Sequence, residues 1–456
     1  MSAPWKCPQL QDSMLSPAQS EPGILPAGTC GRVDRAGRPG ALSPVRRGLG
    51  RHRGYMNQAL SDVTVLDLGQ VIAMPFCTML LADMGARVIK VESRERGRER
   101  VSLGIKRKRN GVEERVPAAQ YRDRNKLAVT LELKTPQGIE LFKELVRHCD
   151  VVTENFSVGT LARLGLGYED LKRVKPDIVY ASITAFGQHG PYAAQRGYDM
   201  LAQAISGYMS ITGFPDQPPT RSGQSISDYY AGMLCAFSIV SALHYRQRTG
   251  MGQHIDLALL DSLIIALDNL GERYTVGGEL LTRAGNVSFG GSSSGVYPTT
   301  DGHVAIAAGA SDAVWRRFCE IIGRSDLTRD AGFATAAARR DRRDQVATII
   351  QGWTSARSKA EVVSTLSTGG VPAAPVNNVA EMVADPQVKA REMFVELDHP
   401  TYGRVKTTGT PLKLSETPGR VKWLAPSPGE HNREVFVDLL GHSPSELAQW
   451  ISEGVI

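Results

Sequence analysis

The chain has 456 residues, 42% of them hydrophobic, which is enough for two or three units with cores of their own. The net charge of +6 suits anionic ligands, but part of the basic excess lies in the first 55 residues, so nucleic acid is not expected as a partner. No uninterrupted apolar run reaches the roughly 20 residues that a membrane span requires. The sequence therefore predicts a protein that neither crosses a membrane nor is anchored in one.

Residues 1–55 are rich in Pro, Gly, Ser and Arg and show neither helical nor strand periodicity. We interpret them as a disordered leader or an over-annotated start, with Met56 as an alternative first residue and a transit peptide as the competing reading. The six cysteines lack CxxC spacing, which favours reduced thiols and a cytoplasmic location. The nine histidines form no HxxxH or HExxH pair, so no metal site is predicted.

The core begins at Val63 with a strand–helix–strand pattern over residues 63–92, typical of a buried parallel sheet. The turn from Gly69 to Pro75 lacks the GxGxxG spacing, which argues against a nicotinamide dehydrogenase. A second unit follows, with a strand at 127–133, a helix from Thr135 to His148 and strands at 150–156 and 177–187. Ligands bind outside the carboxyl ends of such strands.

Residues 93–126 separate these units and look irregular and very basic. Solvated surface is the simplest interpretation, and contacts to the phosphates of an anionic ligand are the alternative. The cations are Arg94, Arg96, Arg98, Arg100, Lys106, Arg107, Lys108, Arg109, Arg122 and Arg124.

Two acids, Asp199 and Asp228, bracket the segment from Arg196 to Gly232. Each stands beside a turn or at the head of an apolar helical run, where free backbone amides and the helix dipole favour an ionised carboxylate. Plain helix caps are the alternative interpretation.

The remaining chain predicts a helix over 229–245, a strand and helix over 253–271, and a Gly/Ser-rich linker at 289–295. A smaller α+β unit follows, and then an antiparallel hairpin after Asp385. We expect domain boundaries at 56–285 for the large domain, 286–384 for the small domain, and 385–456 for a return to the large domain.

Eight motifs in order carry a resemblance. They are VTVLDLGQVIAMPFCTMLLADMGARVIKVE from Val63, RNK from Arg124, ENF from Glu154, LGYEDL from Leu166, GYD from Gly197, SISD ending at Asp228, RTGMGQHIDLALLDS from Arg248 and DPQVKAREMFVELDHPTYGRVK from Asp385. Together they resemble the family III CoA-transferases, to which the alpha-methylacyl-CoA racemases are related. The resemblance implies an α/β fold with a Rossmann-like large domain, a smaller α+β domain and an interlocked homodimer.

The resemblance also assigns the site. It implies that Asp228 is the nucleophile and Asp199 a second acid that orients or polarises the site. Coenzyme A and its acyl group would contact Val71, Ile72, Arg94, Asn155, Phe156, Arg163, Leu164 and Arg196. A lid loop that closes over the intermediate would include Gly290, Gly291 and Ser292.

The implied reaction moves CoA from an acyl-CoA donor, with succinyl-CoA as a candidate, to a carboxylic acid through mixed-anhydride and aspartyl-CoA intermediates. Acyl-CoA is then a substrate, and no permanently bound cofactor is expected. A 2-methylacyl-CoA racemase is one alternative, but that branch has His where this chain has Tyr198. A non-catalytic acyl-CoA-binding subunit of a hetero-oligomer is the other, and the presence of Asp228 speaks against it.

Overall fold

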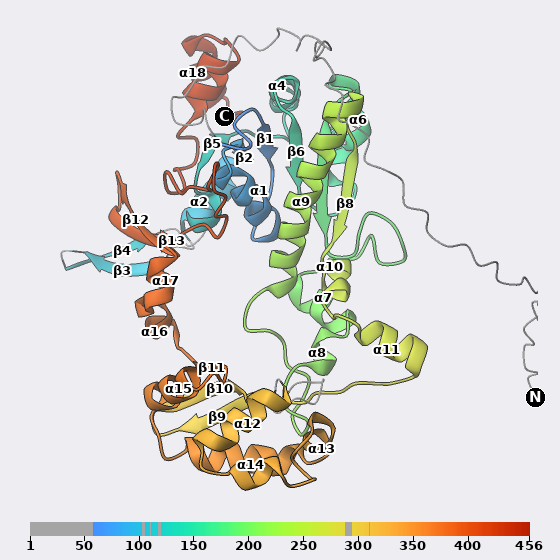
Figure 1. The fold of residues 1–456 in the computed structure, drawn as a ribbon. Coiled ribbons are helices and arrows are strands. Elements are labelled where there is room, and N and C mark those ends of the chain that lie inside the picture. The colour runs from blue at the N-terminus through green and yellow to red at the C-terminus, as the bar shows by residue number, and fades with distance from the viewer. Residues whose placement is uncertain (1–57, 103–104, 110, 117–119, 288–293, 310) are drawn as a thin grey trace, which may run out of the picture. The chain divides into compact units, whose positions relative to one another are not determined.

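The structure is a computed structural model that describes residues 58–102, 105–109, 111–116, 120–287, 294–309 and 311–456 (Figure 1). The expectation for residues 1–55 therefore lies outside the described residues. So does the expected lid at Gly290, Gly291 and Ser292.

The main element is a six-stranded sheet, parallel throughout, in the order β5-β2-β1-β6-β7-β8. The chain first builds outward from β1 to β2 and β5 and then crosses to the other side of β1 to add β6, β7 and β8. The strand order therefore reverses between β1 and β6. The strands are β1 (Thr64–Asp67), β2 (Arg87–Glu92), β5 (Lys126–Thr130), β6 (Val151–Glu154), β7 (Val179–Thr184) and β8 (His254–Ala258).

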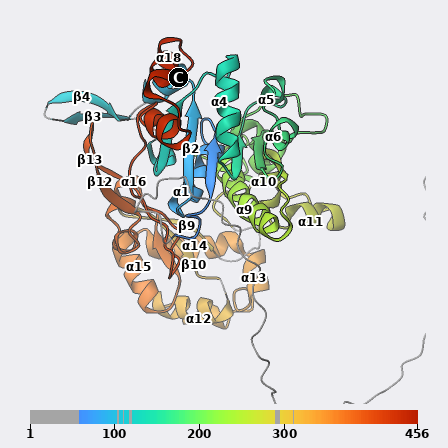
Figure 2. The ribbon, with the colours of Figure 1, turned by 90° about the horizontal axis from the view of Figure 1, so that it is seen from above.

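Helices cover both faces of this sheet (Figures 1 and 2). Successive residues of a strand point to opposite faces, so Leu66 joins the core on one face and Val65 the core on the other. The first core takes side chains from α4 (Pro136–Arg147), α5 (Thr160–Arg163), α6 (Tyr168–Val174), the π-helical segment η2 (Arg433–Leu439) and α18 (Pro444–Ser452). The second takes them from α1 (Ala73–Asp83), α7 (Asp199–Ile205), α8 (Tyr208–Ile211), α9 (Ile226–Thr249) and α10 (Leu259–Ile265).

The longest helix, α9, is apolar on two faces. By length and composition it could cross a membrane, with a mean hydropathy of 1.4 in its most apolar window, although the sequence predicted no span. One face, with Cys235 and Ile239, packs into the core against α1 and the sheet. The opposite face exposes Met233 and Phe237, the latter at 71%. One apolar face of α9 is thus explained by the core, whereas the other is exposed to solvent.

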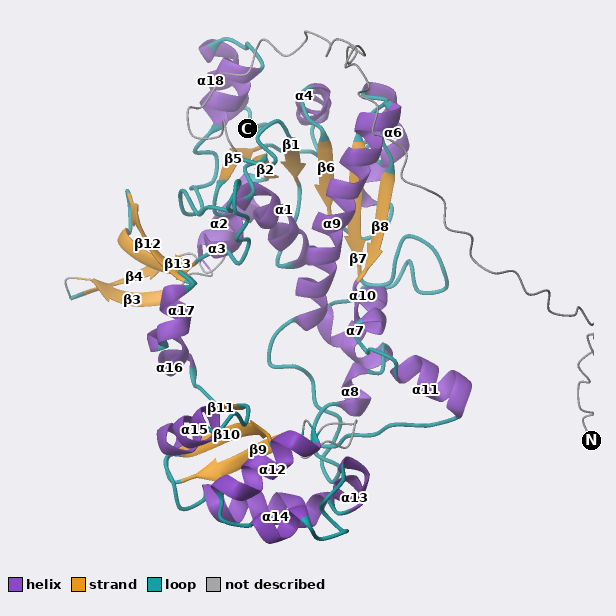
Figure 3. Ribbon diagram, viewed as in Figure 1, coloured by secondary structure: helices purple, strands orange, loops and turns teal. Residues whose placement is uncertain are grey.

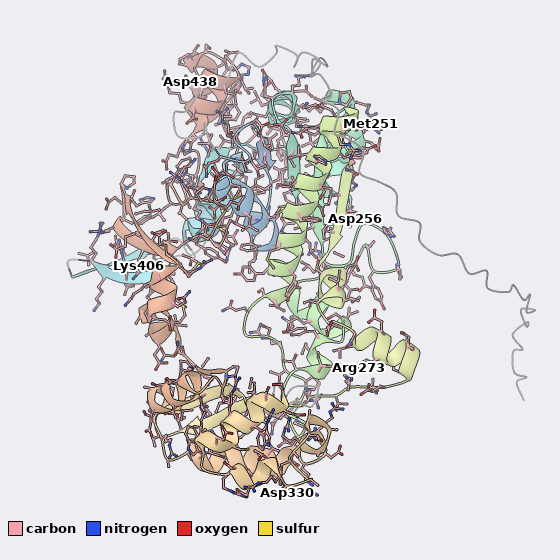
Figure 4. The ribbon with its side chains drawn as sticks, viewed as in Figure 1. Met251, Asp256, Arg273, Asp330, Lys406 and Asp438 are labelled. Carbon is pink, nitrogen blue, oxygen red and sulfur yellow. The ribbon has the colours of Figure 1, made fainter. Side chains whose placement is uncertain are left out.

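The basic segment, expected to be irregular, is ordered over its described residues. It forms α2 (Arg94–Ser102), an antiparallel hairpin of β3 (Ile105–Arg109) and β4 (Val112–Val116), and the short helix α3 (Gln120–Asp123). Cross-strand ion pairs explain the order: Arg107 binds Glu114 at 2.6 Å and also donates to backbone oxygens of Tyr402 and Arg404. Both residues belong to the predicted second hairpin, formed by β12 (Phe394–His399) and β13 (Gly403–Thr408): Tyr402 lies in its turn and Arg404 in β13, on which Figure 4 labels Lys406.

Residues 294–375 enclose a third core around a three-stranded antiparallel sheet, β11-β10-β9 (Figure 3). Trp315, Phe318 and Ile350 are fully buried in it. Its elements are β9 (Ser294–Thr299), β10 (Gly302–Ala307), α12 (Asp312–Ile321), η1 (Ser325–Thr328), α13 (Ala336–Asp341), α14 (Arg343–Thr354), α15 (Lys359–Thr368) and β11 (Ala373–Pro375). The helix α11 (Leu270–Gly277) precedes this part of the chain, and α16 (Val379–Ala384) and α17 (Pro386–Ala390) follow it.

The segment after β13 returns to the large sheet and lines the free edge of β5. Ala128 exchanges two hydrogen bonds with His431, whose N–H donates at 3.0 Å and whose Nδ1 accepts at 3.1 Å. The N–H of Thr130 donates to Asn432 at 2.9 Å. The edge strand is therefore covered by residues about 300 positions away in sequence.

Candidate active site

Buried charged residues hold the turn that follows β1 in place. Asp67 accepts hydrogen bonds from the N–H of Gly69 at 2.7 Å and from the hydroxyl of Thr78 at 2.8 Å. Lys126 binds the same carboxylate at 2.9 Å and donates to the carbonyl of Pro75 at 3.1 Å. Because Asp67 and Lys126 are both fully buried and paired, removing either would leave a costly uncompensated charge. The turn from Gly69 to Pro75 is thus held at both ends.

Residues 71–73 lead this turn into α1. Val71 has φ +64, a left-handed conformation that is unusual for a β-branched residue, and its side chain is 70% exposed. Ile72 is the N-cap of α1 and offers no side-chain hydrogen bond to the helix end. The N–H of Ala73, the first residue of α1, lies near enough to Asp228 to lower the pKa of its carboxyl group. The free amides and partial positive charge at the start of α1 therefore face the predicted nucleophile.

Asp228 is the third residue of α9 and lies in its first turn rather than at the cap position suggested by the sequence, and Ser225 is the N-cap. One turn later, Gly232 meets α1: a Cβ there would lie 2.7 Å from the carbonyl oxygen of Ala73 and 2.9 Å from Phe76 Cδ1. Any larger residue would push the helices apart. Gly232 therefore permits the close approach that places the start of α1 against Asp228.

Asp199, the first residue of α7, is buried and fully engaged. Its Oδ1 accepts from both the N–H and the hydroxyl of Ser227, at 2.9 and 2.8 Å. Its Oδ2 accepts from Gln203 at 2.7 Å, and the Gln203 oxygen in turn accepts from the N–H of Ser222. Asp199 thus caps α9 from a neighbouring helix, because Ser225 makes no side-chain cap of its own.

Burial and the charge of Asp199 raise the pKa of Asp228, Arg122 and the N–H of Ala73 act to lower it, and the net result is a pKa of about 7. A carboxyl group with a pKa near neutrality is a better nucleophile when ionised than an ordinary one, and it needs little energy to lose its charge in an ester or thioester. The sequence did not predict this shift, because the shift comes from burial and from residues far apart in the chain.

A small polar cluster borders Asp228 on the side of α3. The hydroxyls of Tyr121 and Tyr229 lie 2.5 Å apart, and Arg122 donates to the Tyr121 oxygen at 3.1 Å. Phe76 meets the Tyr229 ring edge-on, with centroids 4.9 Å apart. These contacts fix the orientation of Tyr229, the residue after Asp228.

A cavity of about 920 Å³ runs along the carboxyl ends of β1, β2, β5 and β6, where the strand order reverses. That edge is where open parallel sheets bind ligands. Its size suits a large cofactor-like substrate. Among the residues that line it are Gly69, Val71, Pro75, Lys90, Arg96, Arg122, Lys134, Phe156, Thr160 and Leu164.

Several predicted site residues gather at this cavity. Val71, Phe156 and Leu164 line it, and Arg163, which precedes Leu164, is exposed and bonded to Thr160 at 3.2 Å. Asn155 holds the turn instead: its amide accepts from the N–H of Gln70 at 2.7 Å and donates to the carbonyl of Gln70 at 2.8 Å. Its role toward a ligand stays a prediction.

Two other predicted residues lie elsewhere. Arg94 borders an adjoining pocket of about 300 Å³ with Arg98 and Ile456. Arg196 is exposed on the loop before α7 and lines neither pocket. Of the basic segment, Arg124 is buried in an ion pair with Asp83 at 2.6 Å and is unavailable to a phosphate.

A second buried acid lies at the end of β6. Burial raises the pKa of Glu154 to about 7, with a contribution from the charge of Asp256, which Figure 4 labels on β8. The Glu154 carboxylate accepts the N–H of Phe156 at 2.7 Å. Glu154 thus shapes the cavity wall through Phe156 and does not itself line the cavity.

The sequence reasoning missed residues that contact or act on the two acids and on Tyr229. Arg122 was one of ten cations in a basic segment, and Tyr121 and Gln203 were not singled out. No local signal distinguishes them, because each acts through a residue on another element. Within the described residues, no group of three or more His, Cys, Asp or Glu side chains is arranged to hold a metal ion.

Comparison with known proteins places this arrangement in a class. The family model described as CoA-transferase family III matches residues 60–432. The chain is 37% identical to the succinyl-CoA–D-citramalate CoA-transferase of Chloroflexus aurantiacus, covering 87% of this chain and 98% of that protein. It is 40% identical to the succinate–glutarate CoA-transferase of Agrobacterium fabrum, covering 83% and 95%.

A solved structure agrees. The crystal structure of a CAIB/BAIF family protein from Brucella suis superposes with a TM-score of 0.75 at 35% identity, covering 84% of this chain and all of that one. The fold of this chain is thus shared with a solved member of the CAIB/BAIF family. The chain belongs to CoA-transferase family III and is a CoA-transferase, as the motifs predicted.

Proposed function

We propose that the protein transfers CoA from succinyl-CoA to a second dicarboxylic acid, with Asp228 as the covalent nucleophile. The names of the two relatives support this choice of acids, because both combine succinate or its thioester with another dicarboxylic acid. The observation that carries the proposal is the close approach of α9 to the start of α1 at Gly232, together with an Ala73 N–H near enough to Asp228 to act on the pKa of its carboxyl group.

The reaction begins when an Asp228 oxygen attacks the thioester carbonyl of the donor. The C–S bond breaks, CoA leaves as a thiolate, and Asp228 becomes part of a mixed anhydride with the donor acyl group. The thiolate then attacks the Asp228 carbonyl, releasing the donor acid as a carboxylate and leaving an aspartyl-CoA thioester. Attack by the acceptor carboxylate and return of the thiolate repeat these two steps in reverse order.

The start of α1 supports each of these steps. Negative charge develops on a carbonyl oxygen in every tetrahedral intermediate, and preorganised backbone N–H groups stabilise it. The free amides at the start of α1 include that of Ala73, which already acts on the pKa of the Asp228 carboxyl group. Gly232 keeps this donor in reach because it lets the two helices touch.

We assign Asp199 to positioning. All of its described hydrogen bonds go to Ser227 and Gln203, so it holds the first turn of α9 in place. Its negative charge also keeps the pKa of Asp228 high. This departs from a direct polarising role for Asp199.

We further propose that CoA occupies the cavity along the strand ends. Val71, Ile72, Asn155 and Phe156 would lie along the pantetheine and acyl part. Arg94, Arg163 and Leu164 would lie nearer the nucleotide, and Arg196 would meet a phosphate from the exposed loop before α7. Cationic side chains around the cavity support this assignment.

The larger organisation is part of the same proposal: a Rossmann-like large domain at 56–285, a smaller α+β domain at 286–384 and a C-terminal return at 385–456. The exposed apolar face of α9, with Met233, Phe237 and Val240, supports an interlocked homodimer in which a second copy covers that face. We place the enzyme in the cytoplasm, without a permanently bound cofactor.

A trapping experiment tests the nucleophile. Wild-type enzyme is incubated with succinyl-CoA alone, digested with protease and analysed by mass spectrometry, in parallel with a hydroxylamine quench. We expect CoA attached at Asp228, or its hydroxamate after the quench. CoA at Asp199, or transfer without any adduct, would show that the assignment is wrong.

A further inference from the structure

Two lysines contact the turn that follows β1 and are already bound to internal acids. Lys126 is buried between Asp67 at 2.9 Å and Asp123 at 3.1 Å, and Lys90 donates to the carbonyl of Gly69 at 3.0 Å and lies 3.4 Å from Asp123. Their charges are therefore balanced by internal acids. They support the turn and the strand ends and are not arranged to take up a substrate carboxylate.

Arg122 is placed differently. It lines the large cavity, and among the described residues no acidic side chain forms an ion pair with it. Its Nε atom is buried and has no hydrogen-bond partner in the part of the chain that the structure describes. A buried donor without a partner is costly. Arg122 thus retains hydrogen-bonding capacity toward the cavity.

The side chain of Arg122 is nevertheless held in one orientation. Its guanidinium lies 4.9 Å from the ring centroid of Tyr121 and donates to the Tyr121 hydroxyl. That hydroxyl is bonded to Tyr229, the neighbour of Asp228 in the chain. The guanidinium is therefore positioned relative to the nucleophile before any substrate arrives, which lowers the entropic cost of binding.

The electrostatics of the reaction call for a cation at this position. A dicarboxylic acid that reacts through one carboxyl group brings a second negative charge into a partly buried site that already holds Asp199 and Asp228. Arg122 is close enough to Asp228 for its charge to act on that carboxyl. Once Asp228 is converted to a thioester, it is neutral. The negative charge on which Arg122 acted is then gone, and the guanidinium can bind a carboxylate of the incoming acid.

We infer that Arg122 binds the second, non-reacting carboxylate of a dicarboxylic acid and so makes the CoA transfer selective for dicarboxylic over monocarboxylic acids, an inference that rests on the proposed function. The planar guanidinium matches a carboxylate with two parallel hydrogen bonds. The reacting carboxyl group meets the α1 amides instead, and the two ends of the acid are recognised by different elements.

The test compares two acceptors of nearly equal shape, glutarate and its monoamide, with succinyl-CoA as donor. Wild type should prefer glutarate, in kcat/KM, by about 10- to 100-fold, the range for a charge-assisted hydrogen-bonded pair. Arg122→Gln should lose that preference by lowering kcat/KM for glutarate while the value for the monoamide stays within about threefold. Arg173→Gln, which changes an exposed cation on α6, should leave both values unchanged.

Two milder variants protect the test against misfolding. Arg122→Lys keeps the charge but not the paired geometry, and Tyr121→Phe removes the hydroxyl that holds the guanidinium. Both should reduce kcat/KM for glutarate by less than Arg122→Gln does and spare the monoamide, and melting temperatures will show whether each variant folds.

The outcomes separate the two proposals. Equal losses for both acids in the Arg122 variants, or equal use of both acids by wild type, would overturn the role of Arg122 while CoA transfer through Asp228 stands. No transfer to any acid by wild type would overturn the proposed function and this inference with it.

Discussion

The starts of α7 and α9 each carry an acid, and the two acids are treated in opposite ways by their surroundings. Asp199 is the first residue of α7, and both of its carboxylate oxygens accept hydrogen bonds, from Ser227 and from Gln203. Asp228 lies in the first turn of α9, half-buried, and the Ala73 N–H and the like charge of Asp199 act on the pKa of its carboxyl group in opposite directions. The first acid is locked into a network, and the second retains free lone pairs and a raised pKa.

This difference shows how a fold divides two similar side chains between support and chemistry. An acid saturated with hydrogen bonds cannot attack without breaking a helix cap. An acid that is desolvated but poorly bonded is destabilised as an anion, and that energy becomes available when the charge is lost in a covalent bond. The following predictions test this division.

The largest effect is expected from Asp228→Asn, which preserves shape but removes the nucleophile. CoA transfer should fall by about 10⁴-fold or more, as when other covalent nucleophiles are removed. CoA binding, measured by calorimetry, should persist, because Asp228 does not line the cavity. If Asp228→Asn retained even a tenth of the activity, Asp228 would not be the nucleophile that separates it from Asp199.

The second prediction concerns pH. Because burial raises the pKa of Asp228 to about 7 and the ionised form attacks, kcat/KM for the donor should rise about tenfold per pH unit from about pH 5 to 7 and then level off. Rates would be measured over that range under conditions where the fold is intact by circular dichroism. A profile that is flat across it would mean that Asp228 titrates normally.

Asp199→Asn should have an intermediate effect. The new amide would face the Gln203 amide, so Gln203 must turn and release the N–H of Ser222. We expect a loss of about 1 to 3 kcal/mol in the free energy of unfolding and a fall in kcat of about 10- to 30-fold as the first turn of α9 loosens. The pH midpoint should move downward because a like charge is gone. A loss equal to that of Asp228→Asn would instead give Asp199 a direct chemical role.

Gly232→Ala should give the smallest effect. The added Cβ would press on Ala73 and Phe76, so α1 must shift by a few tenths of an ångström or more. We expect about a fivefold to tenfold loss in kcat and a loss of about 1 to 3 kcal/mol in stability. The matched control is Gly352→Ala in α14, where the Cβ meets nothing within 4 Å and stability should rise slightly.

Much of the large sheet could be predicted from sequence because its strands are short apolar runs bounded by turns. The strands near Leu66, Val129 and Val152 were all expected, and the order of the motifs identified the family. The β3–β4 hairpin was not expected, because Arg107 and Glu114 stabilise it by charge and not by an apolar pattern.

Asp199 and Asp228 were also singled out from sequence, since helix starts and small residues leave local marks, and the family resemblance implied unequal roles for them. The contacts that make their surroundings unequal were not predicted. The saturation of Asp199 depends on Gln203 and Ser227, and the pKa of Asp228 depends on burial and on Arg122 from a different element. Such contacts arise only when the chain has folded.

The edge of β5 is covered by the C-terminal segment around His431 and Asn432, which has a consequence for the synthesis of the protein. Ala128 and Thr130 form their edge hydrogen bonds with His431 and Asn432, 303 and 302 positions later. At about 5 to 20 residues per second, a ribosome needs about 15 to 60 s to synthesise the intervening chain. During that interval β5 is an open strand edge, prone to pairing with other chains. Growth at high translation load should therefore increase aggregation of nascent protein, and chaperones that bind exposed strands should reduce it.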